Sequence, residues 1–171
     1  MGLDITAYQQ IELIPCIQNE NHEYVNELTG LVEQNIIKIH QDSEFTTQLN
    51  PLKNYSTYKY KYERHYHSIS YHGYNLWRDN LAKIAGYKPK TTKSEYSHAI
   101  AAWHSTEGKF HELINFTDCY GAIGHKTIQK LLIDFEKQVL DNDLEHYFVN
   151  AYHQIWNAFI FARDEGLVLF H

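Results

Sequence analysis

Cysteine, proline and long apolar runs are scarce in this sequence of 171 residues. Its two cysteines, Cys16 and Cys119, do not imply a disulfide framework and are typical of a reducing compartment. No apolar run reaches the length of a transmembrane helix, and no secretory signal peptide opens the chain. We therefore expect a cytoplasmic protein that makes no contact with membranes.

Positive charge is also limited, because 15 Lys and Arg residues stand against 21 Asp and Glu residues, for a formal net charge of -6. General nucleic-acid binders usually present a basic face to the phosphate backbone, so this balance argues against that class. The sequence also lacks a glycine-rich phosphate loop, since the stretch from Gly121 to Gly124 is too short for one. We predict no general nucleic-acid binding and no cofactor.

Aromatic residues, by contrast, are abundant: the chain has 14 Tyr, 8 Phe and 3 Trp. Such side chains suit both protein cores and binding faces. Hydrophobic residues make up 43% of the chain and charged residues 21%, a balance typical of globular proteins. The length fits one domain covering residues 1–171.

The first half of the chain has the sequence pattern of β-strands. In the clearest of them, 58–71, tyrosines alternate with charged residues and histidines, and we interpret the tyrosine face as core. The polar segment 20–33 is predicted to be a loop or a short helix, and 41–56 a loop. Strands are predicted at 3–8, 11–17, 36–40 and 58–71.

The second half has helical periodicity. Asn75 and Gly86 are candidate caps of the first helix, and a second, short helix would carry Tyr96, Ile100 and Trp103 on one side. Helices are predicted from 75 to 85, from about 94 to 103, around 128–139 and from 143 to 165, with a loop-rich passage at 108–124 and a last strand at 167–170. The pattern predicts an α+β fold in which an antiparallel sheet from the N-terminal half is covered by the C-terminal helices.

Three stretches together carry a family resemblance. They are the opening Met-Gly-Leu-Asp-Ile-Thr-Ala-Tyr, the segment Gly73–Arg78 with its continuation to Tyr87, and the segment Glu112–Gly124. The chain resembles a group of uncharacterised bacteriophage and prophage proteins, which begin alike and share a Ser/Thr-Asp-Cys-x-Gly loop before a helix. The resemblance implies an accessory protein in the host cytoplasm that acts on host defence or host metabolism.

The passage from His111 to His125 is the richest in chemically active side chains. Asp118 and Cys119 are predicted to lie just before a helix N-terminus, where the helix dipole and free amides lower the pKa of a thiol. His111 or His125 could serve Cys119 as a general base, oriented by Asp118 or Glu112. This arrangement would form a small thiol-dependent hydrolase or transferase.

A structural interpretation of the same passage is equally concrete. Thr117 or Asp118 caps the following helix, Gly121 and Gly124 provide tight backbone, and Cys119 is a small buried residue.

His65 and His67 form a second candidate site. Residues two apart on a strand point to the same side, so both imidazoles could bind one metal ion. His72, His104 or a carboxylate would have to complete the ligand set of a metal-dependent hydrolase. The alternative is a solvent-facing histidine pair beside Lys61.

The third candidate combines basic and aromatic side chains. Arg78 lies beside Tyr74 and Trp77, and arginine next to aromatic faces suits an anionic, stackable ligand such as a nucleotide. The alternative places the two aromatic side chains in the core and pairs the arginine with a carboxylate. The predicted ligand-binding set is Arg64, Tyr74, Trp77, Arg78, Glu112 and Asn115.

From these observations we expect a non-enzymatic phage accessory protein that binds a host protein or a small anionic ligand. The expectation depends on the resemblance, the aromatic surplus and the lack of a catalytic signature. The rival hypothesis is a small thiol- or metal-dependent hydrolase that uses the passage from His111 to His125. A third is a structural protein that forms a homo-oligomer.

Overall fold

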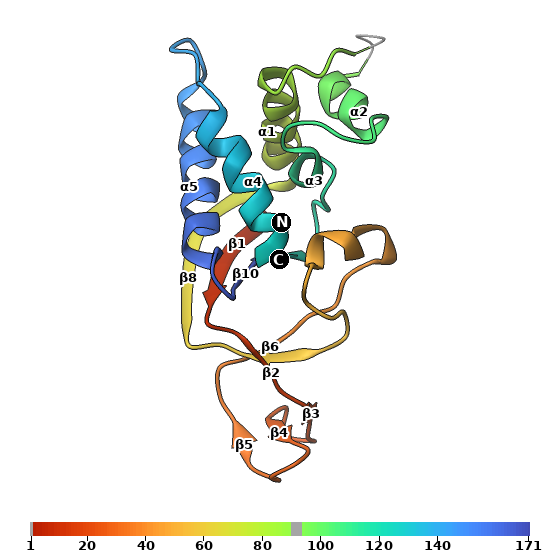
Figure 1. Ribbon diagram of the computed structural model, residues 1–171, viewed down its shortest axis with the longest axis vertical. Coiled ribbons are helices and arrows are strands. Elements are labelled where there is room, and N and C mark those ends of the chain that lie inside the picture. The colour runs from red at the N-terminus through yellow and green to blue at the C-terminus, as the bar shows by residue number, and fades with distance from the viewer. Residues whose placement is uncertain (1, 90–93) are drawn as a thin grey trace.

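The computed structural model describes residues 2–89 and 94–171, and its fold is α+β, as predicted (Figure 1). A four-stranded antiparallel sheet forms the centre, and the N-terminal and C-terminal strands are neighbours within it. The predicted strands 3–8 and 167–170 are both confirmed. In spatial order the sheet consists of β8 (Tyr62–Ser70), β1 (Gly2–Gln9), β10 (Leu167–Phe170) and β9 (Gly121–Gly124).

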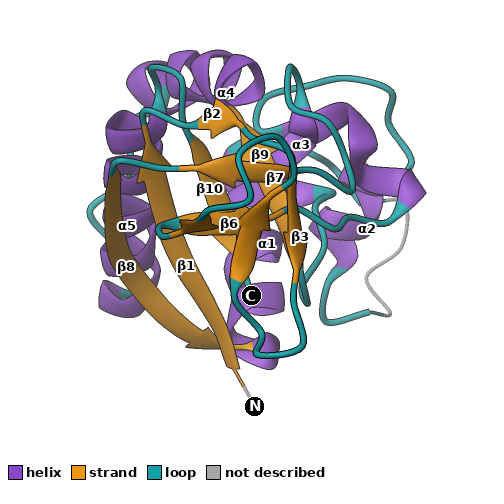
Figure 2. Ribbon diagram, turned by 90° about the horizontal axis from the view of Figure 1, so that it is seen from below, coloured by secondary structure: helices purple, strands orange, loops and turns teal. Residues whose placement is uncertain are grey.

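Helices cover one face of this sheet (Figures 1 and 2). Helices α4 and α5 pack against each other and against the sheet, while α1 leads from the end of β8 to a cluster with the short α2 and α3. The shared core is strongly aromatic, which accounts for much of the aromatic surplus. The helices are α1 (Tyr71–Ile84), α2 (Ser97–Trp103), α3 (His111–Ile114), α4 (His125–Lys137) and α5 (His146–Ala162).

A second, smaller core lies on the opposite face of the sheet. Alternation along β10 sends Val168 and Phe170 to the helical side and Leu167 and Leu169 to the other, so the whole strand is buried. The other buried side chains of this core are Tyr8, Ile37, Ile39, Leu49, Tyr58 and Ala122. The cover consists of a small sheet of β2 (Glu12–Leu13), β7 (Thr57–Lys59) and β6 (Ile36–Lys38), together with the 3-10 helix η1 (Ser43–Leu49).

The segment 20–33 is not the predicted loop or short helix but most of a three-stranded hairpin sheet. Two asparagines make its turns: the Asn19 side chain accepts hydrogen bonds from the backbone of Asn21 and Glu23, and the Asn26 side chain accepts one from Leu28 at 2.9 Å. Such side-chain turns are invisible to hydrophobic periodicity. The strands are β3 (Cys16–Gln18), β4 (Tyr24–Asn26) and β5 (Val32–Glu33).

Two predicted strands are each divided in the structure. The run 11–17 becomes β2 and β3 because it breaks next to Pro15, which has no N–H to donate to a sheet. The run 58–71 becomes β7 and β8, which belong to different sheets. Its tyrosine face is divided with it, so that Tyr58 is buried in the smaller core while Tyr62 is exposed.

The first helix begins four residues earlier than predicted. Ser70, not Asn75, is its N-cap, and the Ser70 hydroxyl accepts a hydrogen bond of 3.0 Å from the Gly73 amide. The C-terminal prediction is confirmed, because Gly86 follows the helix with a φ of +94°. None of the helices in residues 2–89 and 94–171 combines the length and apolar character needed to cross a membrane.

Candidate functional site

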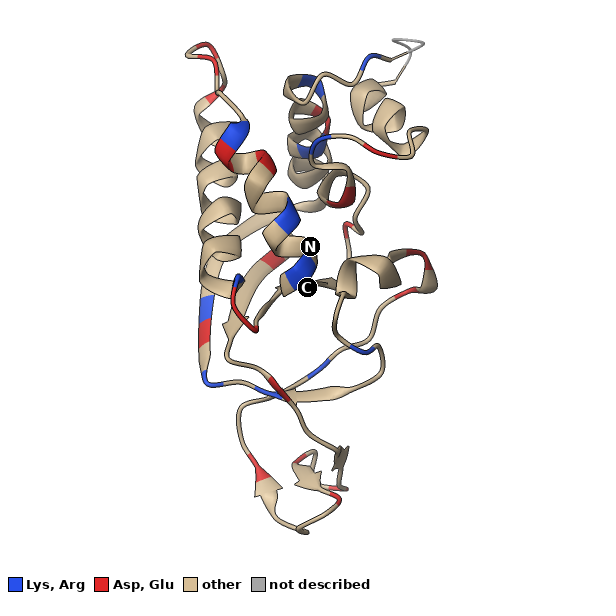
Figure 3. Ribbon diagram, viewed as in Figure 1, with Lys and Arg blue, Asp and Glu red and all other residues tan. Residues whose placement is uncertain are grey.

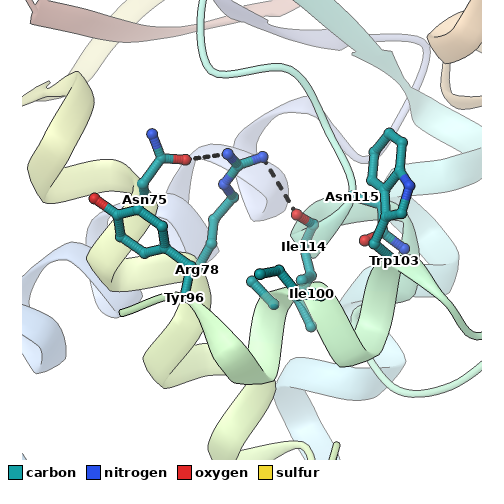
Figure 4. A pocket seen from close by; sticks show the side chains of 8 residues that line it. Asn75, Arg78, Tyr96, Ile100, Trp103, Ile114 and Asn115 are labelled. Carbon is teal, nitrogen blue, oxygen red and sulfur yellow. Dashed lines mark hydrogen bonds between the residues drawn. The ribbon is translucent and has the colours of Figure 1, made fainter. Parts of the chain in front are cut away.

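A pocket of about 210 Å³ opens between α1, α2 and α3, and polar and aromatic side chains line it (Figure 4). Each wall comes from a different helix. The lining residues are Asn75, Arg78, Tyr96, Ala99, Ile100, Trp103, Ile114 and Asn115.

Hydrogen bonds from neighbouring elements hold α2 in place as one wall of this pocket. At its N-terminus, the Asp79 carboxylate on α1 accepts hydrogen bonds from the amides of His98 and Ala99, at 2.8 and 2.9 Å. At its C-terminus, the Asn115 side chain donates a hydrogen bond of 3.2 Å to the Ala102 carbonyl. The short helix is therefore fixed at both ends by side chains from outside it.

Arg78 forms the floor of the pocket, and its charge is used within the protein. The guanidinium donates hydrogen bonds to the carbonyls of Ile114, at 3.3 Å, and Phe116, and to the side-chain oxygen of Asn75. It also lies over the Tyr74 ring, 5.0 Å from the ring centroid. Arg78 thus ties the chain after α3 to the side of α1.

Asp118 provides the negative charge that balances Arg78, at 3.8 Å, and it accepts a hydrogen bond of 2.9 Å from the Asn75 side chain. Partial burial alone would raise the pKa of this carboxyl group. The hydrogen bond from Asn75 and the charge of Arg78 outweigh the burial, so the net effect is a lowered pKa. The sequence offered two interpretations of Arg78, as a ligand-binding residue or as the partner of a carboxylate. The ion pair with Asp118 agrees with the second.

The rim of the pocket carries two large apolar side chains in solvent. Trp103 is 56% exposed and Ile100 is 42% exposed, and both project from α2 beside the floor (Figure 4). Across the pocket, the Tyr96 hydroxyl is 3.0 Å from Nδ1 of His72, and this contact orients the Tyr96 ring. The rim is partly aromatic and partly exposed to solvent.

Of the predicted ligand-binding residues, only Arg78 and Asn115 line this pocket. Tyr74 and Trp77 are fully buried in the main core, where they stack on each other. Arg64 lies instead over Phe161 of α5, 5.3 Å from the ring centroid. The predicted set therefore does not converge.

Glu112, the remaining member of that set, lies in a different cavity. Its carboxylate pairs with Lys130 of α4, and the cavity of about 330 Å³ around both residues also includes His111. The sequence did not predict Ile100 and Trp103 as pocket residues. It did place both on one side of a short helix, and that shared side could have indicated a binding surface.

Cys119 does not occupy the predicted position before a helix. Strand β9 separates it from α4, whose N-cap is Gly124 and neither Thr117 nor Asp118. The residue is exposed, so the buried alternative is wrong as well. Partial desolvation, together with the hydrogen bond and charge of Asp118, raises the pKa of its thiol, the opposite of what a nucleophile needs.

Neither candidate general base is hydrogen-bonded to Cys119 among the described residues. Nε2 of His111 lies 3.1 Å from the Ser105 carbonyl, and Nδ1 of His125 is buried without a hydrogen-bond partner among the described residues. The thiol of Cys119 instead donates to Asp118, at 3.5 Å. Within residues 2–89 and 94–171, no hydrogen bond joins the thiol to either histidine, so the predicted catalytic group is not assembled.

The histidine pair on β8 is divided by a β-bulge. His65 pairs with Thr6, but His67 pairs with Ile5, because the register shifts by one residue between them. Paired residues share a face, so His67 lies on the side of the buried Ile5 and His65 on the other. The predicted metal pair is therefore wrong, and no group of three or more His, Cys, Asp or Glu suited to a metal ion occurs in the described part of the chain.

The environment of Cys119 gives a first prediction. In a Cys16→Ser background, iodoacetamide should alkylate Cys119 more slowly at pH 8 than it alkylates an unstructured cysteine peptide, because less of the thiol is ionised. Asp118→Asn should accelerate the reaction by removing the negative charge beside the sulfur. Reaction faster than the peptide would instead restore Cys119 as a candidate nucleophile.

Comparison with known proteins adds no relative to this description. No family model, no curated protein and no solved structure matches the chain.

Proposed function

We propose that this protein is a non-enzymatic binding protein whose α1–α2–α3 pocket receives one apolar or aromatic side chain of a protein partner. The observation that carries the proposal is the exposure of Trp103 and Ile100 beside a hydrogen-bonded polar floor. Tryptophan is enriched among the residues that contribute most to protein–protein binding, especially where it borders a pocket. An uncovered tryptophan in this position has no role in the main core.

The size and charge of the pocket favour a protein side chain over a nucleotide. Pockets for small molecules usually enclose about 300–1,000 Å³, whereas this one encloses about 210 Å³. Its cation, Arg78, is already matched by Asp118 and by backbone carbonyls. An anionic ligand would have to displace that carboxylate to gain an ion pair.

The neighbouring chemistry also supports binding over catalysis. Cys119 has a raised pKa, and the histidines proposed as its base are bonded or buried elsewhere. The resemblance to phage accessory proteins makes a cytoplasmic host protein, of defence or metabolism, the expected class of partner.

The pocket can be tested with a minimal probe that carries an aromatic side chain. N-acetyl-tryptophan amide, added to ¹⁵N-labelled protein, should shift the indole signal of Trp103 and the side-chain amide of Asn115, whereas adenosine monophosphate should not. Trp103→Ala should weaken probe binding at least about tenfold, which corresponds to about 1.4 kcal/mol. NMR titration measures both effects.

Ile133→Ala serves as the matched control, because Ile133 is also an exposed apolar residue but lies on α4. This variant should bind the probe like the wild type. Tighter binding of adenosine monophosphate would favour the small-ligand alternative, and the absence of shifts with either probe would remove the pocket as a binding site.

A further inference from the structure

The hairpin sheet of β3, β4 and β5 projects from the body at the end of the molecule opposite α2 (Figure 1). None of its residues belongs to the two cores. Two hydrogen bonds fasten its base: the Cys16 amide donates to the Thr57 hydroxyl at 3.1 Å, and the Glu27 amide donates to the Pro15 carbonyl at 2.9 Å. The projection is thus attached to the body but contributes nothing to its interior.

One face of the hairpin sheet is an apolar row. The strand register places Ile17 opposite Val25 and Val25 opposite Val32, so these three side chains share a face across all three strands. Ile17 is 56% exposed and Val32 is 54% exposed. Two leucines in the segment between β4 and β5, Leu28 and Leu31, are 83% and 66% exposed.

These side chains are apolar although they lie outside both cores. A two- or three-stranded ribbon that served only as a connection would carry polar residues on a face turned to solvent. Several exposed apolar residues gathered on one projecting element are typical of an interaction surface. We use "hairpin face" for the apolar side of the sheet, formed by Ile17, Val25 and Val32, together with Leu28 and Leu31 of the adjoining connection.

The charge around this face has one sign. Residues 16–33 contain four glutamates and no lysine or arginine (Figure 3). Glu33 is neutralised by Lys59 of the body, at 2.6 Å, while Glu20, Glu23 and Glu27 are exposed. The apolar residues are therefore accompanied by three exposed glutamates that form no ion pair with the part of the chain that the structure describes.

We infer that the hairpin face docks onto a protein surface in which lysine and arginine surround an apolar patch. The apolar row would bury against the patch, and the three glutamates would select and steer a basic partner. The Asn19 and Asn26 turns hold the hairpin in shape before binding, which limits the entropy lost on docking.

A second copy of the chain is a poorer occupant. Two hairpin faces brought together would place their glutamates against each other in a protein of net charge -6. The inference does not depend on the pocket at α2, because the two surfaces lie at opposite ends of the molecule (Figure 1). One molecule could therefore hold two partners.

The test uses the intact protein and two synthetic peptides of about twelve residues, one alternating lysine with leucine and one alternating glutamate with leucine. The lysine peptide should bind, with an affinity that falls at least about tenfold between 50 and 300 mM NaCl, and the glutamate peptide should not. Calorimetry or anisotropy measures both. Equal binding of the two peptides would overturn the charge complementarity.

Matched variants distinguish the effect of the hairpin glutamates on peptide binding from the effect of the net charge of the protein. The triple change Glu20→Lys, Glu23→Lys and Glu27→Lys should reduce binding of the lysine peptide at least about tenfold. The control reverses three exposed acids elsewhere, Glu136, Asp141 and Asp143, and should reduce binding less than threefold. An equal loss in both triple variants would mean that the peptide responds to total charge, and the inference would fail.

The apolar part and the folding of the hairpin need their own variants. Leu28→Ser and Leu31→Ser change exposed side chains outside both cores, so they should leave thermal unfolding unchanged while weakening the peptide severalfold. Trp103→Ala should bind the peptide with wild-type affinity, which would show that the peptide does not bind at the α1–α2–α3 pocket. Sedimentation that shows a dimer abolished by Leu31→Ser would instead assign the hairpin face to a second copy.

Discussion

Gly124→Ala should lower the free energy of unfolding by about 3 kcal/mol or more. Gly124 is the residue at which β9 ends and α4 begins. An added Cβ would lie 2.1 Å from the Leu49 carbonyl oxygen and 2.7 Å from the Asn50 carbonyl oxygen. Both are backbone atoms at the end of η1, so no side-chain rotation can relieve the clash. The main sheet and its cover over the smaller core would have to separate.

Gly86→Ala is the control for this experiment. Gly86 has a φ of +94° but open space around the position of a Cβ, so alanine there should cost only about 1 kcal/mol of backbone strain. Urea unfolding at pH 7 compares the two variants with the wild type. Equal losses would mean that η1 can move away from β9 without cost, and the close contact of Gly124 with the carbonyls of Leu49 and Asn50 would not stabilise the fold.

The glycines also illustrate where sequence reasoning stops. Gly121 and Gly124 bound a four-residue strand, yet glycine is a poor strand former and the passage was predicted to be a loop. Their presence reflects the close approach of η1 and of the Phe116 ring, which only the tertiary structure contains. The long helices were predictable, because burying one face imposes a period on α4 and α5 that survives in the sequence.

Polar side chains account for most of the other differences. The turns at Asn19 and Asn26 created strands inside a polar segment, and the cap at Ser70 moved the start of α1. A one-residue bulge separated His65 from His67. Each depends on a single local hydrogen bond or register choice, and none alters the hydrophobic pattern.

The candidate site was predictable only in part. The sequence placed Ile100 and Trp103 on one side of a short helix, and the structure confirms that helix as α2. That this side remains uncovered depends on how α1 and α3 approach it. Arg78 and Asn115 were predicted to bind a ligand. In the structure, both line the pocket and both donate hydrogen bonds to backbone carbonyls of its walls.

Arg78→Met should be the second large effect, with a loss of about 3 kcal/mol in the free energy of unfolding. Methionine keeps the apolar stem over Tyr74 but leaves the carbonyls of Ile114 and Phe116 without their donor. It also removes the cation beside Asp118, whose side chain is 39% exposed and can be partly solvated, so the lower end of the range for a broken buried pair applies.

Arg163→Met is the matched control for that change. Arg163 pairs with Asp164 at 3.1 Å, and both side chains are more than half exposed, so the variant should change stability by less than about 0.5 kcal/mol. Thermal and urea unfolding measure both variants. A small effect of Arg78→Met would mean that water replaces the guanidinium, and Arg78 would no longer be the structural floor of the pocket.

The pH dependence of stability distinguishes the charge of Arg78 from its hydrogen bonds. Asp118 has a lowered pKa when folded, so its ionised form stabilises the protein above the ordinary aspartate value near 4, and this contribution is lost as the pH falls below it. Between pH 5 and pH 2, wild-type stability should therefore fall more steeply than that of Asp118→Asn. If Arg78→Met removes the ion pair, its curve should approach that of the asparagine variant. If the curve keeps the wild-type slope, hydrogen bonds, chiefly the one from Asn75, hold the pKa of Asp118 low, and the main role of Arg78 is to bind the carbonyls after α3.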